Sequence, residues 1–315
     1  MRLRQLVPGR ALFGYLLYTA AVLLLMLWLQ FPEAAVKAKA EAELNQLLPA
    51  FAWQIGGISL TLPADIRFSQ ISISEKGGKE PLFIAESISL RPDLAGWQKT
   101  GRWSVRYTVR LLDGSISGNL GLTKDKQNLQ YSGEVSGIRL DSPGLKKVLA
   151  AYKRKLSGTL SASFAGRQDR RQGLFAVLEG KVTVSKGTVS LQEPVLGMKE
   201  LAFAAVSSKV SKQGGTLRLQ DGTLESKLLA AEFAGSLRLT EPVFRSPVQL
   251  QGAVLPRPEF LASLGSPMVV NMLKRQLRQD KMPFTLNGTV QEPGIIFKGL
   301  PPDFNRLLQD KAKKP

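Results

Sequence analysis

The dominant pattern in the chain is an alternation of apolar and polar residues that begins near Gly57 and continues almost to the C-terminus. A period of two places successive side chains on opposite faces, as in a β-strand with one buried face. The pattern predicts an antiparallel sheet with one apolar and one polar face. The alternating segments are 59–62, 65–74, 82–90, 103–112, 115–122, 129–140, 159–166, 181–184, 188–191, 201–211, 216–220, 231–239, 247–255 and 284–290.

Pairs of turn-forming residues separate many of these segments and predict hairpins. The pairs are Gly77-Gly78, Asp113-Gly114, Lys186-Gly187, Gly214-Gly215 and Asp221-Gly222. A loose motif, a glycine followed by alternating small polar and aliphatic residues, starts at Gly114, Gly158, Gly180, Gly187, Gly222, Gly235 and Gly288. Its spacing is irregular, which argues against a strict solenoid. Two explanations stay open: a sheet extended by similar hairpins, and the general use of glycine before strands.

A few helices are expected among the strands. Over 33–48 the residues Val36, Ala40, Leu44 and Leu47 form one apolar stripe, and Pro49 ends the segment. Further helices are predicted at 143–155, 258–264, 268–279 and 302–309, the first with Ser142 as N-cap and Pro143 at the first helical position. The helices at 143–155 and 268–279 are candidates to cover the apolar face of the sheet.

The N-terminal segment predicts a membrane anchor. Residues 11–31 carry no charge, and a transmembrane helix needs about 20 apolar residues. Arg2, Arg4 and Arg10 precede the segment, so the positive-inside rule places the N-terminus in the cytoplasm. A cleaved signal peptide has a shorter apolar core and a cleavage site close behind it, whereas the nearest A-x-A, at 38–40, lies well beyond the apolar end.

These segments predict a domain order for a single-pass inner-membrane protein. Residues 1–10 form a cytoplasmic stub, 11–31 the transmembrane anchor and 32–48 a juxtamembrane helix. Residues 49–315 form one periplasmic β-rich body, with a soft internal boundary near residue 170 where the sequence is polar and charged. The expected fold class is mainly β: an extended, twisted antiparallel sheet or groove with a few short helices, preceded by the transmembrane helix.

Composition removes most classes of catalytic site. The chain of 315 residues contains no His and no Cys, which excludes Ser-His-Asp triads, Cys-His pairs, His-rich or Cys-based metal sites and disulfides. A Ser-Lys hydrolase and a carboxylate-pair glycosidase need neither residue type, but no Ser, Lys, Asp or Glu residues converge in a recognisable motif. The sequence therefore predicts a non-enzymatic protein without a cofactor or metal.

The net charge of +18 is concentrated in clusters. We expect these clusters to contact phospholipid headgroups, lipopolysaccharide or an acidic partner, with a solvated basic surface as the alternative. Nucleic acid is not an expected partner, because the body is exported and no aromatic residues are interleaved with the basic runs. The candidate contact residues are Lys146, Lys147, Lys153, Arg154, Lys155, Lys274, Arg275 and Arg278.

The order of these elements resembles the type II secretion system protein N family, in the longer form found with AsmA-like proteins. The segments that carry the resemblance are the anchor, FPEAAVKAKAEAELNQLLP, WSVRYTVRLLDGSISGNLGL, KLSGTLSASFAG, LRLTEPVFRSPVQLQGAV and LNGTVQEPGIIF. The resemblance rests on pattern and order across nearly the whole chain and carries no catalytic residues.

The resemblance implies two functions. The first is a scaffold or assembly accessory of the type II secretion system, which exports folded proteins across the outer membrane, with other secretion-system proteins as partners. The second is AsmA-like lipid handling by an apolar groove between the inner and outer membranes. A scaffold predicts a filled sheet interior, whereas a lipid carrier predicts a continuous apolar trough.

Overall fold

The chain forms one large antiparallel sheet. In the computed structural model of residues 1–315, the described residues are 13–19, 22–23, 26, 32–47, 51–61, 65–75, 81–101, 103–122, 128–143, 145–146, 155–169, 173–240, 243–264, 267–277 and 280–299. The sheet has 14 strands in the order β1 to β14, so every strand pairs with its neighbours in sequence. This meander confirms the predicted mainly β fold with a few short helices.

Most strands overlap the alternating segments, but the first strand begins at Phe51, well before segment 59–62, and the last, Pro293–Phe297, lies in no predicted segment. Their bounds are β1 Phe51–Thr61, β2 Asp65–Glu75, β3 Pro81–Pro92, β4 Ser104–Leu111, β5 Gly114–Leu122, β6 Leu129–Arg139, β7 Leu156–Asp169, β8 Gly173–Val195, β9 Met198–Gln213, β10 Thr216–Glu225, β11 Leu229–Arg238, β12 Pro247–Pro256, β13 Met282–Thr289 and β14 Pro293–Phe297. The predicted segments 181–184 and 188–191 are parts of one long strand, β8.

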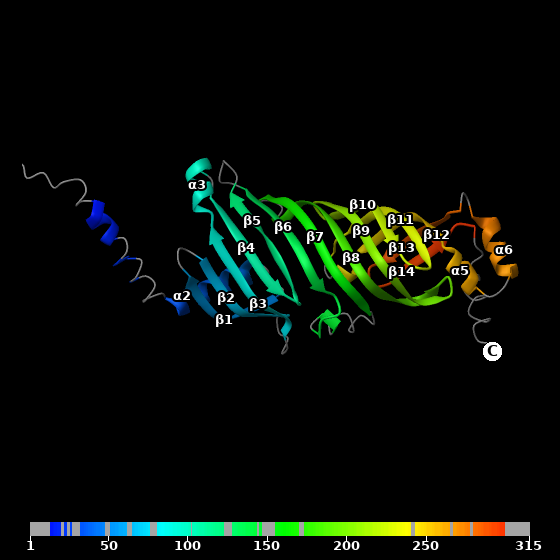
Figure 1. The fold of residues 1–315 in the computed structure, drawn as a ribbon, viewed down its shortest axis with the longest axis horizontal. Helices are drawn as coiled ribbons and strands as arrows, with labels where there is room; N and C mark the ends of the chain where they lie inside the picture. The colour runs from blue at the N-terminus through cyan, green and yellow to red at the C-terminus, as the bar shows by residue number, and fades with distance from the viewer. Residues whose placement is uncertain are drawn as a thin grey trace, which may run out of the picture.

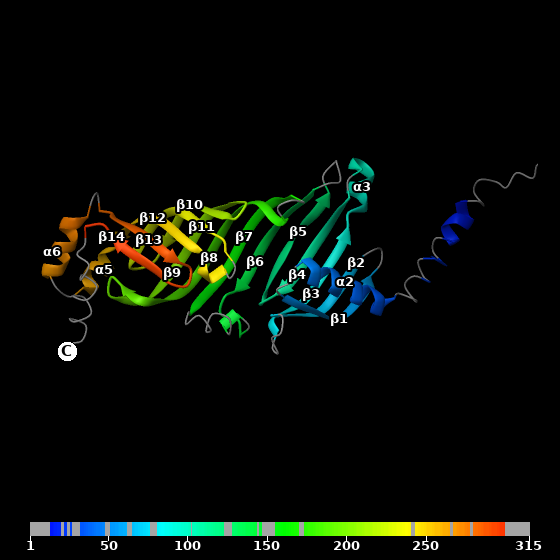
Figure 2. The same ribbon diagram turned by 180° about the vertical axis from the view of Figure 1, so that it is seen from behind.

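The sheet is long and twisted, and its C-terminal half curls round on itself. In Figure 1 strands β8 and β9 lie in front of β13 and β14, and in Figure 2, seen from behind, β12 to β14 are in front. Helices α5, Pro258–Ser263, and α6, Pro267–Gln276, lie at the C-terminal end of the molecule, and α2, Glu33–Leu47, lies at the opposite end. The two ends are therefore closed by different helices.

Helix α2 closes the N-terminal end in two ways. Its apolar stripe, Val36, Ala40 and Leu44, packs against a core formed around Ile55, Ile58, Ile71 and Ala85 on β1 to β3. Its polar side chains accept hydrogen bonds from the backbone of β1, the first strand of the sheet. The Ile55 N–H donates to Glu41 Oε1 at 2.7 Å, the Ile58 N–H to Glu33 Oε1 at 2.9 Å and the Trp53 N–H to Asn45 Oδ1 at 3.0 Å. These acceptors occupy backbone donors that an edge strand otherwise presents to other chains.

A second core lies at the C-terminal end of the sheet. Leu196, at the turn between β8 and β9, packs in one cluster with Val254 and Met282 from β12 and β13. Phe260 of α5 and Leu273 of α6 join the same cluster, and both are almost fully buried. Because residues from β8 and from β13 meet here, the apolar side of the sheet faces the inside of the curl.

Two predicted hairpin turns are wrong. Lys186-Gly187 lies inside β8 and Asp221-Gly222 inside β10, and each pair is a β-bulge that adds one residue to its strand. Lys186 and Asp221 adopt the left-handed conformation, with φ of 51° and 50°. Bulges and tight turns both favour a residue in the left-handed conformation, so the sequence pattern predicted a turn where the structure has a bulge. The pairs Asp113-Gly114 and Gly214-Gly215 do lie at turns, between β4 and β5 and between β9 and β10.

The predicted helices have different outcomes. Those at 33–48, 258–264 and 268–279 are confirmed as α2, α5 and α6. Of the helix expected at 143–155 only residues 143 and 145–146 are described as helical, and 302–309 lies outside the described residues. A short helix that the pattern did not predict, α3 (Leu94–Thr100), connects β3 to β4.

The expected anchor, 11–31, falls partly outside the described residues. Its described residues, 13–19, 22–23 and 26, are helical. Within the described part of the chain, no helix combines the length and the apolar composition needed to cross a membrane. The stub at 1–10 lies outside the described residues, and so do residues 170–172 at the soft boundary predicted near residue 170.

Candidate functional site

The most distinctive surface of the protein is the apolar side of the sheet, called here the inner face. The strand register places the inner-face residues of neighbouring strands in continuous rows: Ile116 of β5 lies opposite Val109 of β4 and Val135 of β6, and Val135 lies opposite Ala162 of β7. On β4 to β8 the inner-face residues are Val105, Tyr107, Val109, Leu111, Ile116, Gly118, Leu120, Leu122, Leu129, Tyr131, Gly133, Val135, Leu160, Ala162, Phe164, Gly166, Leu178, Gly180, Val182 and Val184. None of these side chains carries a charge.

The opposite side of the same strands, the outer face, is polar. Its residues on β4 to β8 are Arg106, Thr108, Arg110, Ser115, Ser117, Asn119, Gln130, Ser132, Glu134, Ser136, Ser161, Ser163, Ala165, Arg167, Glu179, Lys181, Thr183 and Ser185. A sheet with one polar and one apolar face needs something to cover the apolar side. At the two ends that cover is α2 on one side and α5 with α6 on the other.

The middle of the inner face belongs to neither core. From β5 to the central part of β8, its residues pack with neither the α2 cluster nor the α5–α6 cluster. Most of them are half-buried, although Tyr131 and Ile138 are buried and Leu122 is exposed. Among the described residues the helices lie at the ends of the sheet or at its rim, and none crosses this region in Figures 1 and 2. The described structure therefore presents an apolar trough between two closed ends.

Aromatic rings lie flat on the floor of this trough because glycines stand beside them. A Cβ atom on Gly133 would meet Tyr107 Oη at 2.5 Å and Phe164 Cζ at 2.8 Å, and one on Gly166 would meet Tyr131 Oη at 2.5 Å. The same arrangement recurs where Phe203 lies over Gly187 and Phe233 over Gly222. The glycines leave space at the backbone, so that the rings cover the sheet instead of standing upright. The mid-strand glycines of the sequence thus have a packing role in addition to their role at turns.

Three polar groups on the inner face, two of them on β4 to β8, are bonded to the backbone. Tyr107 Oη donates to the Ser132 carbonyl at 3.2 Å, and Tyr131 Oη donates to the Val177 carbonyl at 3.1 Å. Ser208 Oγ lies 3.0 Å from each of the carbonyls of Lys209 and Gln220. Burial raises the pKa of the Tyr107 and Tyr131 phenols above the ordinary tyrosine value. Because these groups already have protein partners, the trough offers its contents an almost purely apolar surface.

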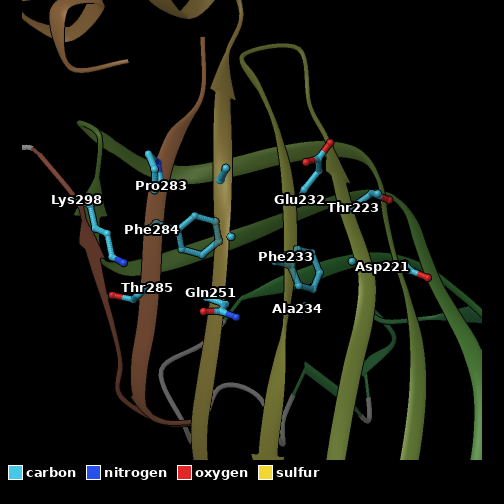
Figure 3. Close-up of a pocket in the computed structure, with 13 residues that line it drawn as sticks. Asp221, Thr223, Glu232, Phe233, Ala234, Gln251, Pro283, Phe284, Thr285 and Lys298 are labelled. Carbon is cyan, nitrogen blue, oxygen red and sulfur yellow. The ribbon is translucent and has the colours of Figure 1, made fainter. Parts of the chain in front are cut away.

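A separate hollow of about 700 Å³ lies over β10 to β13 (Figure 3). Phe233 and Phe284 line it together with the polar residues Asp221, Thr223, Glu232, Gln251, Thr285 and Lys298. Both carboxylates in it are paired, Glu232 with Lys281 and Asp221 with Lys209, each at 2.8 Å. The pairing with Asp221 also raises the pKa of the exposed Lys209 ammonium. These are surface ion pairs, and we assign no chemistry to this hollow.

The predicted basic residues form two separate groups. Lys146 and Lys155 lie on the connection between β6 and β7, whereas Lys274 and Arg275 lie in the last turn of α6, at the C-terminal end of the molecule in both views. All four are exposed. Lys147, Lys153, Arg154 and Arg278 lie outside the described residues. The four described candidates therefore lie at two different places in the molecule.

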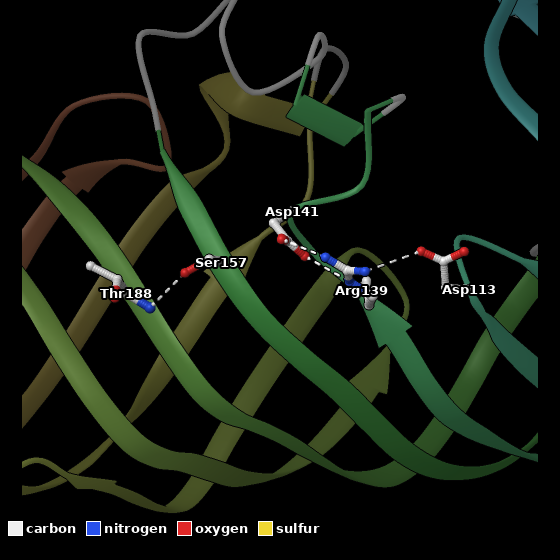
Figure 4. A network of polar contacts seen from close by, with 5 residues as sticks. All are labelled: Asp113, Arg139, Asp141, Ser157 and Thr188. Carbon is white, nitrogen blue, oxygen red and sulfur yellow. Dashed lines mark hydrogen bonds and ion pairs between the residues drawn. The ribbon is translucent and has the colours of Figure 1, made fainter.

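An ion-pair network fixes the start of the β6–β7 connection (Figure 4). Arg139 at the end of β6 donates two hydrogen bonds to Asp141, at 3.1 and 2.9 Å, and lies 3.7 Å from Asp113 of the β4–β5 turn. The hydrogen bond to Arg139 lowers the pKa of Asp141, and the same bond raises the pKa of Arg139. The network links two neighbouring hairpins at the rim of the trough.

The comparisons with known proteins identify no family. No protein-family model matches the chain, and no curated protein or solved structure matches it either. Among the described residues no group of three or more Asp and Glu side chains is arranged to hold a metal ion. The resemblance to secretion-system and AsmA-like proteins therefore stays a prediction.

Proposed function

We propose that the protein binds the acyl chains of lipids along its inner face, and that it does so without chemical conversion of the lipid. The observation that carries this proposal is the continuous apolar trough from β5 to the central part of β8, whose residues belong to neither end core. Burial of apolar surface is worth about 25 cal/mol per Å², so an extended hydrocarbon chain is a favourable occupant of such a surface. The uncharged, backbone-bonded floor supports a long apolar ligand over a polar one.

The flat aromatic floor supports the same occupant. Tyr107, Tyr131 and Phe164 cover neighbouring glycines, which leaves depth above the sheet for a flexible chain. Among the described residues no set of polar groups converges on the floor of the trough. The floor therefore suits a ligand that binds through a long hydrocarbon chain. Lys274, Arg275, Lys146 and Lys155 are then candidates to contact anionic headgroups at the rims.

The location that fits this function is the periplasmic side of an inner membrane, with the N-terminus in the cytoplasm. This part of the proposal rests on residues 11–31 and the arginines before them. Several described side chains in the segment, including Phe13, Leu16 and Leu23, are exposed in the isolated chain, which is the expected condition of residues that contact lipid tails. The segment would hold the trough at the surface from which lipid is taken.

The experiment that tests the proposal places a charge on either face of one strand. Val182 of β8 lies on the inner face and Thr183, the next residue, lies on the outer face. Full-length protein, Val182→Glu and Thr183→Glu are purified and their lipids are extracted and quantified by mass spectrometry. A carboxylate beneath an acyl chain loses its water, at a cost of several kcal/mol, so Val182→Glu is expected to lose bound lipid. Thr183→Glu is expected to keep it, and a lipid-free wild-type protein would reject the proposal.

A second function, a scaffold in the type II secretion system, is favoured by one feature of the sheet edges. The backbone of β1 is occupied by side chains of α2, whereas the outer edge of β14 has no partner strand among the described residues. An open edge can accept a strand from another protein. Replacing Ile295 by Pro removes a backbone donor from β14. If the scaffold function holds, this variant loses secretion-system proteins that co-purify with the wild type, while its bound lipid is unchanged.

A further inference from the structure

The connection between β3 and β4 exposes a cluster of large apolar side chains that neither core uses. Leu94 and Trp97 of α3, Trp103 and Leu122 are exposed to 47%, 44%, 50% and 39%. We call these four residues the rim patch. In Figures 1 and 2 helix α3 stands at the rim of the sheet, away from α2, α5 and α6. Clustered exposed apolar groups mark an interaction surface more often than scattered ones do.

The rim patch is held in a fixed arrangement. Asp93 caps α3 by accepting the Gly96 N–H at 3.0 Å, and Gly101, with φ of 66°, ends the helix by donating to the Trp97 carbonyl at 2.8 Å. The rings of Trp97 and Trp103 are in contact, with centroids 5.6 Å apart. The Leu122 N–H donates to the Trp103 carbonyl at 3.1 Å, which ties the patch to the end of β5. The capped helix therefore holds Trp97 in a fixed position at the surface, in contact with Trp103 of the following segment.

The patch is continuous with the trough. Leu122 and Leu120 are inner-face residues of β5, and Leu122 is tied directly to Trp103 by the backbone hydrogen bond. An acyl chain that leaves a bilayer beside Trp103 therefore meets apolar side chains that lead onto the inner face.

We infer that the rim patch docks on the surface of a phospholipid bilayer, where it marks the entry of lipid into the trough. Tryptophan prefers the interface between headgroups and acyl chains, because its ring is apolar and its indole N–H is polar. Two exposed tryptophans beside two exposed leucines match that layer. The lipid-entry part of this inference rests on the proposed function, whereas docking itself does not.

The test measures whether Trp97 and Trp103 contact lipid in the full-length protein. Trp28 and Trp53 are replaced by Phe, and the protein is reconstituted into phosphatidylcholine–phosphatidylglycerol vesicles with or without bromine on the acyl chains. Docking predicts a loss of most of the tryptophan emission with brominated lipid, a shift of the emission maximum to shorter wavelength, and weak quenching by acrylamide in water. Equal emission in both kinds of vesicle would overturn the inference. Tryptophans that are shielded from acrylamide only when a partner protein is added, and not by lipid, would overturn it as well.

Two controls separate docking from lipid bound in the trough and from general proximity to the bilayer. The measurement is repeated with Val182→Glu, where a charge occupies the inner face. Quenching that persists supports docking, and quenching that disappears overturns it. A protein with all four tryptophans replaced by Phe and a single Val243→Trp change, at another exposed apolar position, should be quenched by acrylamide and not by lipid. If lipid extraction finds none in the wild type while the quenching persists, the proposed function fails and docking stands.

Discussion

The packing of rings over glycines can be tested by adding a single methyl group. Gly133 lies in the middle of β6 on the inner face, and a Cβ there would lie 2.5 Å from Tyr107 Oη, 2.8 Å from Phe164 Cζ and 2.9 Å from the Ser117 carbonyl oxygen. Real Cβ atoms do not approach heavy atoms so closely. In Gly133→Ala both rings must therefore move away from the sheet, and Tyr107 must leave the Ser132 carbonyl to which it donates at 3.2 Å.

The expected cost follows from three terms. Overpacking typically costs about 1–3 kcal/mol, and the lost hydrogen bond adds about 0.5–1.5 kcal/mol. Replacement of glycine by alanine inside a strand returns about 0.5–1 kcal/mol. The net loss of unfolding free energy should be about 0.5–4 kcal/mol, so steric crowding outweighs the intrinsic benefit of alanine in a strand.

The assay compares urea unfolding of Gly133→Ala with that of a matched control. Gly121, on β5, is also a strand glycine, but its Cβ would meet nothing closer than the Trp103 carbonyl at 3.4 Å, which is an ordinary contact. Gly121→Ala should match the wild type or gain up to about 1 kcal/mol. If Gly133→Ala is as stable as Gly121→Ala, the rings do not lie across the glycines and the flat floor of the trough is refuted.

Two further predictions concern the edge helix and the buried phenols. Glu41→Ala leaves the buried Ile55 N–H without its acceptor and should cost about 1.5–3 kcal/mol of unfolding free energy. Glu43 is exposed, so Glu43→Ala should change the unfolding free energy by less than about 0.5 kcal/mol. Equal values for the two variants would show that α2 does not protect the edge of β1. Because the pKa of Tyr107 and of Tyr131 is raised in the fold, their contribution to stability is fully present below the unfolded tyrosine pKa of about 10 and is lost as the pH rises through the higher folded pKa. Absorbance titration of phenolate formation should show a component of high pKa in the wild type that is missing from the double variant Tyr107→Phe/Tyr131→Phe. Identical titration curves for the two proteins would contradict the burial of both phenols.

The strands could be predicted from the sequence because the alternation is nearly unbroken. Segments such as 103–112 and 115–122 coincide with β4 and β5 to within a few residues. The bulges could not be predicted, since Lys186-Gly187 and Asp221-Gly222 have the same local chemistry as a turn. Whether such a pair forms a turn or a bulge depends on whether the neighbouring strands continue past it. That is decided by pairing with β7, β9 and β11.

The candidate site could be predicted only in part. An apolar sheet face followed from the period of two, but whether helices covered it depended on where the helices dock. Helix α6 packs on the C-terminal core through Leu273 and does not reach over β5 to β7. Helix α3 was missed because it is only 7 residues long, although Asp93 before it and Gly101 after it are ordinary capping residues.

The aromatic–glycine pairs were missed because they join residues on different strands. Gly118 and Gly133 read as isolated breaks in their strands until the register brings both beside Tyr107. Glycine in a strand interior often marks such a close approach, but the sequence alone does not say which ring approaches.

The most direct measurement is site-specific photocross-linking along the trough in living cells. A photoreactive amino acid is placed at Ile116, Val135 or Val182 on the inner face, and at Ser117, Glu134 or Thr183 on the outer face of the same strands. Lipid binding along the inner face predicts lipid adducts at all three inner positions and none at the outer ones. Absence of lipid adducts from the inner positions, or equal labelling of both faces, would contradict it.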